Sequence, residues 1–290
     1  MKKLLFALGI FLIVLGLGLQ LFFLRGTKGQ ALRPNELRSN IAYNDVPTLL
    51  IPGWGGNGWT YSKLIKHYQA ENIAQKTMTI HVSPTGKVKV KGTVAHKKNA
   101  LIQLIFDWNY TKDYVPQTKW LKKTITLLHE RYHVDKLNII AHSWGGSAFV
   151  HAVADSKILQ KQVAYPKVIL LGTPIDESFD ENISYRQAQK QGSNDENYKQ
   201  LVKKFKRFAP QSNITFYNLM GAVAGEKTDG SVPNVQSKFL QKLLRPAWSK
   251  YYQAVYQGVD HTGLHQNVRV LDTMDKILWN KKTIALKEQQ

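Results

Sequence analysis

Cysteine is absent from the 290 residues of this sequence. Its absence excludes a thiol nucleophile, a disulfide framework and a thiolate metal site. It is compatible with a reducing or an oxidising compartment, so it does not indicate a location. The sequence also lacks internal repeats and low-complexity tracts, and its length suits one domain of ordinary enzyme size with one large core.

Acidic residues are scarce. The 20 Asp and Glu residues are outnumbered by 40 Lys and Arg residues, which gives a formal net charge of +20. Such a charge favours anionic partners. No nucleic-acid recognition motif accompanies it, so we expect no specific nucleic-acid partner, and an anionic lipid surface or cell-wall polymer fits at least as well.

The longest uncharged run is at the N-terminus, where residues 4–24 follow Lys2 and Lys3 and contain one strongly polar residue, Gln20. About 20 apolar residues match a helix that spans a bilayer. The run is longer than most signal-peptide cores and lacks a small-x-small cleavage site. We therefore expect a retained signal anchor over residues 1–24 with the rest of the chain extracellular, whereas cleavage would make the protein secreted.

Residues 25–46 have no sustained apolar period and are predicted to form a linker between membrane and domain. The folded domain is predicted to cover residues 47–290. Within it, short β-rich apolar runs alternate with amphipathic stretches, which is typical of a mainly parallel sheet flanked by helices. The predicted strands are residues 48–51, 101–106, 137–141, 168–171, 214–219 and 252–259.

Three other segments have distinct patterns. Residues 78–91 alternate around a Ser-Pro-Thr-Gly turn and predict a β-hairpin at a sheet edge. Residues 117–132 predict the helix that leads into the central strand. The polar segment 181–208 is predicted to be partly helical, and it forms either a small cap over the site or a solvated surface excursion.

A serine follows one of the predicted strands in Ala141-His142-Ser143-Trp144-Gly145. A nucleophile elbow requires small residues at the flanking positions, because the serine occupies a tight turn between strand and helix. The bare pattern Ala-x-Ser-x-Gly is weak. The strand before it and the helix predicted after it give it weight, so Ser143 is the predicted nucleophile.

A serine nucleophile needs a base to take its proton and a carboxylate to orient that base. Asp229 follows a predicted strand at the place where the order Ser, acid, His requires the acid, although Asp-Gly can also be a simple turn. The base is either His261 or His265, which both follow the last strand. We expect His265, directly before the closing helix, with His261 as the alternative base. His142 is expected to shape the site, and surface or packing roles are expected for His81, His96, His133 and His151.

Acyl transfer also needs hydrogen-bond donors for the oxyanion of the tetrahedral intermediate. One expected donor is the backbone N–H of Trp144, directly after the nucleophile. The second is expected from the glycine-rich loop 53–58, where Trp54 is the candidate. This loop lacks the spacing of a phosphate-binding loop, which argues against a nucleotide site.

With these residues in hand, the chain resembles the α/β-hydrolases, and more narrowly the cell-surface hydrolases of unknown function from lactobacilli, listeria and related Gram-positive bacteria. The resemblance covers nearly everything from Pro47 onward. It implies the α/β-hydrolase fold and a triad of Ser143, Asp229 and His265. The matching segments are Gly53 to Gly56, Ser143, Thr228 to Pro233 and His261 to Asn267, and the departures are Pro52 in place of His and Ala141 in place of Gly.

The expected activity is that of a serine hydrolase acting on carboxylic esters of small molecules or lipids through an acyl-enzyme, with no metal or organic cofactor. An acyltransferase with the same triad is an alternative. A second alternative is a non-catalytic surface protein that binds anionic wall polymer or lipid. Aromatic residues near the predicted mouth suggest an apolar or flat substrate group, or they pack against the cap; they are Trp54, Trp59, Tyr61 and Trp144.

Overall fold

The computed structural model describes residues 2–223 and 225–282. Within them eight strands form one sheet in the order β3-β2-β4-β1-β5-β6-β7-β8, and every neighbouring pair is parallel except β2 and β3. The strands are β1 (Thr48–Ile51), β2 (Gln75–Val82), β3 (Val88–Gly92), β4 (Ala100–Phe106), β5 (Asn138–His142), β6 (Lys167–Leu171), β7 (Ile214–Ala222) and β8 (Ser249–Gln257).

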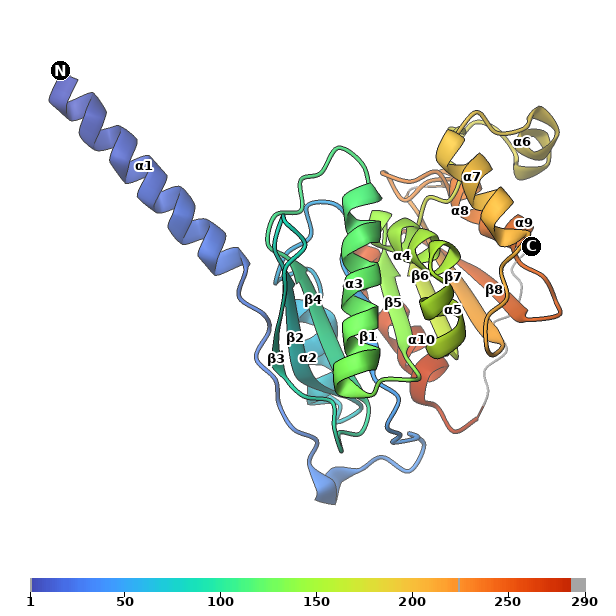
Figure 1. Cartoon of the computed structure of the whole chain (residues 1–290), viewed down its shortest axis with the longest axis horizontal. Helices are drawn as coiled ribbons and strands as arrows, with labels where there is room; N and C mark the ends of the chain where they lie inside the picture. Colours follow the sequence, from blue (N-terminus) through green and yellow to red (C-terminus); the bar gives the residue numbers. More distant parts are fainter. Residues whose placement is uncertain (1, 224, 283–290) are drawn as a thin grey trace.

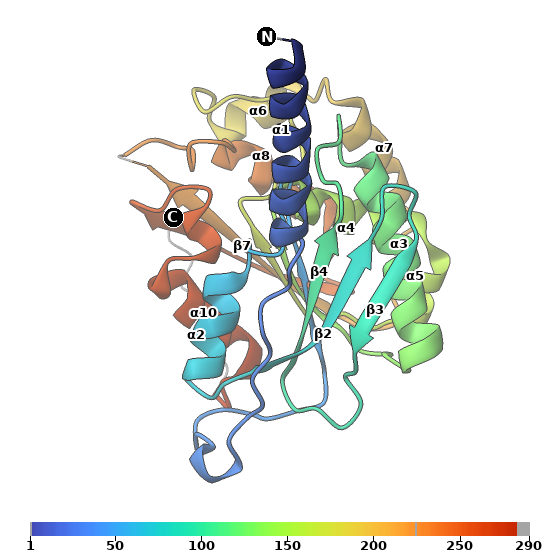
Figure 2. The same ribbon diagram turned by 90° about the vertical axis from the view of Figure 1, so that its left-hand side faces the viewer.

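Helices cover both faces of the sheet (Figure 2). One face carries α2 (Ser62–Ala70) and α10 (Val268–Trp279), and the other carries α3 (Val115–Tyr132), α4 (Trp144–Asp155) and α5 (Lys157–Gln162). Four short helices lie together at one end in Figure 1: α6 (Tyr185–Gln191), α7 (Glu196–Phe205), α8 (Asn234–Lys238) and α9 (Leu240–Leu243). Two 3₁₀ turns are η1 (Pro34–Glu36) and η2 (Gly263–His265).

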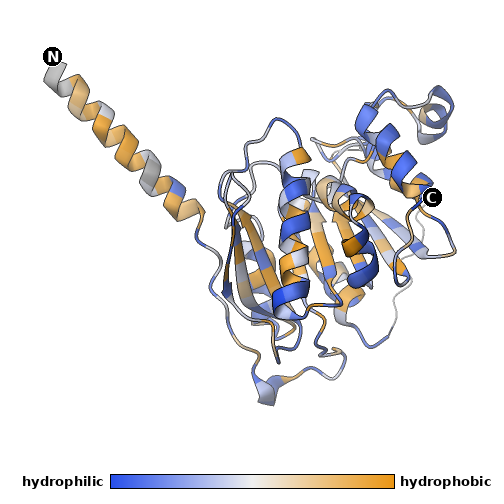
Figure 3. Cartoon of the chain, viewed as in Figure 1, coloured by the Kyte–Doolittle hydropathy of each residue, from blue (hydrophilic) through white to orange (hydrophobic). Residues whose placement is uncertain are grey.

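The central strands read as continuous apolar runs because both of their faces are buried. In β1, Leu49 and Ile51 pack in the core beneath α3 and α4, whereas Leu50 packs in the core beneath α2 and α10. Hydrophobic residues therefore run along the strands and polar residues cover the outward sides of the helices (Figure 3). This is the two-layered core expected of the α/β fold.

The predicted mainly parallel sheet with flanking helices is confirmed, and so are the six predicted strands, with small shifts in their bounds. The hairpin of β2 and β3 lies at the edge of the sheet as expected. The polar segment 181–208 contains α6 and α7. Tyr198, Leu201 and Phe205 of α7 are buried, so this helix is packed onto the domain.

The prediction that residues 25–46 form a linker is corrected by the structure. The backbone N–H groups of Thr27 and Gln30 donate to the side chains of Gln103 and Gln69, each at 2.8 Å. Further along, Ile41 is buried and forms an antiparallel bridge with Asn280. The segment is therefore part of the domain, which begins well before Pro47. Its polar side chains mislead composition-based reasoning because its backbone, more than its side chains, makes the contacts.

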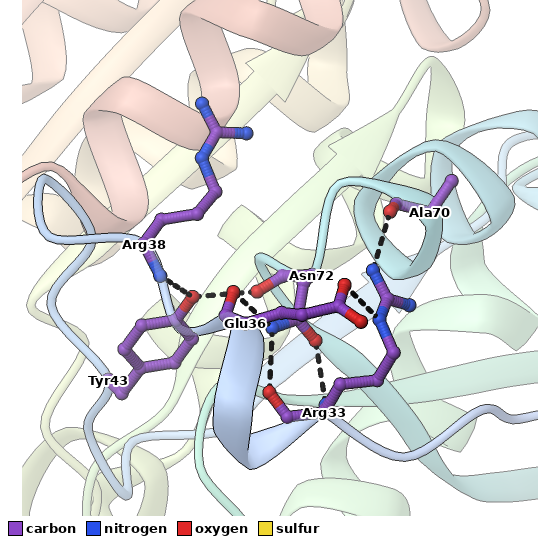
Figure 4. Close-up of polar contacts among 6 residues, drawn as sticks. All are labelled: Arg33, Glu36, Arg38, Tyr43, Ala70 and Asn72. Atoms are coloured by element: carbon purple, nitrogen blue, oxygen red, sulfur yellow. Dashed lines mark hydrogen bonds and ion pairs between the residues drawn. The ribbon is translucent and has the colours of Figure 1, made fainter.

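The side chain of Asn72 is hydrogen-bonded to the middle of the segment 25–46 (Figure 4). Its side-chain oxygen accepts from Arg33 N at 2.8 Å, and its amide donates to the carbonyls of Arg33 and Glu36 at 3.1 and 2.8 Å. The Tyr43 hydroxyl donates to the Asn72 carbonyl at 2.7 Å and accepts from Arg38 N at 3.1 Å. Asn72 is buried with φ of 54°, a conformation that asparagine adopts more readily than most residues.

The N-terminal helix α1 (Lys2–Phe23) projects away from the domain (Figure 1). Its stretch Leu5–Phe23 has a mean hydropathy of 2.5. Among the described residues it is the one helix that is long and apolar enough to cross a membrane, and a signal sequence would share these properties.

Candidate active site

Ser143 lies in a strained turn between β5 and α4. Its φ of 53° and ψ of −136° are unusual for a residue other than glycine, and the first residue of α4 follows it directly. Small residues permit this close packing: a Cβ on Gly145 would collide with the Pro52 carbonyl, and one on Gly146 would collide with the Thr173 side chain. The Ser143 side chain is partly exposed at the carboxyl end of the sheet. The geometry is that of the predicted nucleophile elbow.

The elbow is fixed to the end of β6. Ser143 N donates to the Leu171 carbonyl at 2.9 Å. The next residue, Gly172, has φ of 50°, and a Cβ built on it would lie 2.5 Å from Asp229 Oδ2 and 3.1 Å from His261 Nδ1. Only glycine leaves room for both side chains there. The ends of β5 and β6 and the loop after β7 therefore meet at one place.

Asp229 is paired with His261. The His261 Nδ1–H donates to Asp229 Oδ2 at 2.7 Å, and the His261 backbone N–H donates to the Asp229 carbonyl at 2.8 Å. The other carboxylate oxygen accepts from Ser231 N at 3.0 Å and Val232 N at 2.7 Å. Asp229 is buried, and these donors hold its carboxylate in one orientation. This bond sets the orientation and tautomer of the imidazole, as the acid of a triad does.

The expectation that His265 is the partner of Asp229 is wrong in this structure, and the alternative, His261, occupies that place. Gly258 has φ of 73°, and Val259 forms an antiparallel bridge with Ala222 at the end of β7, which brings residue 261 beside the Asp229 loop. The turn η2 then carries His265 into the core, where its ring lies 5.7 Å from that of Tyr61. His265 Nδ1 has no hydrogen-bond partner among the described residues.

His142 packs between the two histidines. Its Nε2–H donates to the His261 carbonyl at 3.0 Å, and its ring centroid lies 4.3 Å from that of His261 and 4.7 Å from that of His265. Burial, and then the neighbouring His265 and His261, lowers the pKa of His142 well below its usual value. Burial followed by His261 lowers the pKa of His265 to about 4. Both buried rings are therefore neutral at pH 7 and support His261 by packing and hydrogen bonding.

Two backbone N–H groups near Ser143 are candidates for binding an oxyanion. Those of Trp54 and Trp144 make no hydrogen bond to any described residue. Trp144 is the first residue of α4, where the helix dipole favours negative charge. Trp54 follows Gly53, whose hypothetical Cβ would lie 2.6 Å from Ser143 Cβ. Both predicted donors therefore flank the serine.

Sequence reasoning did not identify two residues that shape the site. Gly172 directly follows a predicted strand. A glycine at such a position can indicate that other groups approach the backbone closely at the end of the strand. Glu177, an exposed residue, accepts a hydrogen bond from Trp144 Nε1 at 3.0 Å. No pattern of neighbouring residues in the sequence marks Glu177.

In the described part of the chain, no three His, Asp or Glu side chains are placed to hold a metal ion.

Comparisons with known proteins agree with this architecture. The family model of an α/β-hydrolase of unknown function (DUF915) matches residues 35–281. The crystal structure of a gene product of Listeria innocua is similar with a TM-score of 0.69 and 23% identity, over 80% of this chain and 92% of that chain. A Lactobacillus plantarum protein named as a cell surface hydrolase has a TM-score of 0.63 and 17% identity, over 83% of this chain and 90% of that chain. No curated protein matches the chain.

Proposed function

The chain belongs to the α/β-hydrolase family of unknown function whose model covers residues 35–281, and from this premise we propose that it is a serine hydrolase of carboxylic esters. The proposed triad is Ser143, His261 and Asp229. The observation that carries the proposal is the 2.7 Å bond between His261 and Asp229 at the same sheet edge as a serine held at φ of 53°. Fold alone would not support an activity.

The first half of the reaction forms an acyl-enzyme. Ser143 Oγ attacks the ester carbonyl carbon while His261 Nε2 takes the hydroxyl proton. Asp229 stabilises the imidazolium that results. The N–H groups of Trp54 and Trp144 donate to the oxyanion, an interaction that is stronger in the transition state than in the bound ester. The C–O bond to the alcohol then breaks, and His261 returns its proton to the departing alcohol.

The second half releases the acid. His261 takes a proton from a water molecule, the water oxygen attacks the acyl carbon, and the bond to Ser143 breaks with return of the proton to Oγ. If an acceptor alcohol replaces water, the same steps transfer the acyl group. Product analysis with and without an acceptor alcohol separates hydrolysis from acyl transfer.

We place the enzyme at the cell surface, with α1 as a single-pass anchor and the catalytic domain outside. Support comes from the apolar stretch Leu5–Phe23 and from the preceding Lys2 and Lys3, which favour a cytoplasmic N-terminus. Mass spectrometry of the protein from membranes would test this. A mature chain that begins after residue 24 would indicate a cleaved signal in place of an anchor.

A fluorophosphonate probe tests the catalytic proposal. Wild-type protein is expected to become covalently labelled at Ser143 and to hydrolyse short-chain nitrophenyl esters. Ser143→Ala is expected to lose the label and the hydrolysis. Ser147→Ala, in the first turn of α4, is the matched control, because its buried hydroxyl donates to the Pro174 carbonyl. A folded wild-type protein that is neither labelled nor active would support a binding role.

A further inference from the structure

Four aromatic side chains form an exposed group, here called the aromatic rim, at the carboxyl end of the sheet. Their exposed fractions are 54% for Trp54, 49% for Trp59, 52% for Trp108 and 52% for Tyr110. Large aromatic residues are rarely so exposed in a soluble protein unless they serve a contact. Trp54 is also the proposed oxyanion donor, so the rim borders the proposed catalytic site.

The rim is preformed by contacts among its members. The Tyr110 ring lies 5.5 Å from that of Trp54 and 5.3 Å from that of Trp108, both in edge-to-face arrangements. The Trp54 indole N–H donates to the Thr111 carbonyl at 2.9 Å. These contacts hold the loop 53–59 and the loop 107–114 together, so the exposed aromatic surface needs no rearrangement to engage a partner.

The end of α1 is attached to both loops. The Gly58 N–H donates to the Phe23 carbonyl at 2.8 Å, and the rings of Phe22 and Phe23 lie 4.8 and 5.7 Å from that of Trp59. Gln20 Nε2 donates to the Asp107 carbonyl at 2.8 Å. The aromatic rim is therefore joined to the last turn of the helix that crosses the membrane in the proposed topology.

These attachments fix the height of the rim relative to the bilayer. Gln20 precedes the end of α1 by three residues, about 4.5 Å along the helix axis, and Asp107 bonded to it is the neighbour of Trp108. The loop between β4 and α3 extends from the same end of the sheet as α1, upward in Figures 1 and 2. The rim thus lies where the headgroups of the outer leaflet would be, the depth at which Trp and Tyr collect in membrane proteins.

We propose that the aromatic rim inserts into the outer leaflet of the membrane that α1 spans, so that the catalytic site takes acyl esters of membrane lipids from that leaflet. The proposal rests on the proposed serine hydrolase function for its substrate and on the contacts of α1 for its geometry. The exposed cations Arg25 and Lys28 directly follow α1 and would lie among anionic headgroups. The net charge of +20 has the matching sign.

The absence of cysteine makes a direct test simple, since one introduced cysteine carries one label. Full-length Trp108→Cys and Tyr110→Cys proteins are labelled with a polarity-sensitive fluorophore and reconstituted in vesicles of phosphatidylglycerol and phosphatidylcholine. Leu37→Cys is the matched control, because Leu37 is equally exposed but follows η1, far from α1's junction with the domain. Leu12→Cys reports the insertion of α1.

Blue-shifted emission and quenching by a spin-labelled lipid at positions 108 and 110, with neither effect at position 37, is the expected result. The proposal would be overturned if the labels at positions 108 and 110 showed the same emission and quenching as the water-exposed label at position 37. It would also be overturned if the spin-labelled lipid did not quench the label at position 12. A blue shift that occurs in detergent and depends on protein concentration would point to a second copy of the chain as the occupant and would also overturn it.

Hydrolysis provides a second readout. Trp108→Ser is expected to lower the ratio of lipid-ester to soluble-ester hydrolysis about tenfold, as loss of one inserted indole weakens contact with the leaflet. Leu37→Ser is expected to leave this ratio unchanged. A ratio that is equal in Trp108→Ser and wild type would contradict the proposal. Failure of the wild type to cleave either ester would instead refute the hydrolase function, while the labelling experiment would still decide the position of the rim.

Discussion

At the residue scale, the choice between two histidines four positions apart depends on backbone contacts made by the loop after β8. His261 donates one side-chain and one backbone hydrogen bond to Asp229. His265 is turned into the core, where burial lowers its pKa to about 4. A buried imidazole that resists protonation is a poor general base at neutral pH, whereas a partly exposed imidazole oriented by a buried carboxylate is suited to that role.

Substitution of each histidine separates the two roles. We expect His261→Ala to lower kcat for a soluble ester by a factor of about 10³ to 10⁴, because the proton of Ser143 then has no acceptor. His265→Gln should lower kcat less than about tenfold, since it affects only the packing behind the site. Steady-state kinetics on variants with native circular dichroism would measure both effects. Loss of activity in His265→Gln with retention in His261→Ala would reverse the assignment.

At the element scale, the segment between α1 and β1 determines how α1 is joined to the domain. Its docking relies on Asn72, which follows α2 and satisfies three backbone groups of residues 33 and 36. Because these are buried or half-buried polar groups, losing their partner costs more than an ordinary exposed hydrogen bond would. A docked segment keeps α1 at a fixed position relative to the site, which a flexible linker would not do.

Removal of the Asn72 side chain should release this segment. Asn72→Gly retains the freedom to adopt φ of 54° but loses the three hydrogen bonds, so we expect a loss of about 2–3 kcal/mol in the free energy of unfolding. Trypsin should then cleave after Arg38, which precedes Ser39, faster than in the wild type. Asn213→Gly, at an exposed position, serves as the control. Unchanged cleavage in Asn72→Gly would show that other contacts hold the segment.

At the scale of the whole molecule, three buried histidines make the free energy of unfolding depend on pH. Burial is the largest cause that lowers the pKa of His142, His151 and His265. The pKa of His151 and that of His265 each fall to about 4. Unfolded histidine titrates near 6.5, so between pH 6.5 and 4 the unfolded chain binds protons that the folded chain excludes. The stability that these three histidines contribute is therefore full above pH 6.5 and is lost as the pH falls toward 4.

This linkage can be isolated with His151, which lies outside the proposed site and contacts the Tyr114 hydroxyl at 3.3 Å. It should contribute at most about 3 kcal/mol to the loss of stability between pH 6.5 and 4. We expect His151→Gln to flatten the decline of Tm over this range, and the exposed control His96→Gln to follow the wild type. Parallel declines in all three proteins would contradict the assigned role of His151.

Much of the fold could be predicted because its signals are local. The apolar strands, the elbow at Ser143 and the edge hairpin each follow from the type and spacing of neighbouring residues. Asp229 was predicted from chain order, and the two proposed oxyanion donors from their positions beside the elbow and after β1. His265 was wrongly preferred because its distance from the closing helix carries no information on the contact with Asp229.

The sequence by itself determined the strand and helix pattern, the apolar helix at the N-terminus and the set of residues from which a site could be built, because these properties depend on neighbours along the chain. Only the tertiary structure decided which histidine meets Asp229, that residues 25–46 pack on the domain, and that α1 joins the loops of the aromatic rim. These outcomes depend on hydrogen bonds and ring contacts between residues far apart in sequence, such as Gly58 with Phe23 and His261 with Asp229. Such contacts are satisfied only once the sheet has brought its loops together.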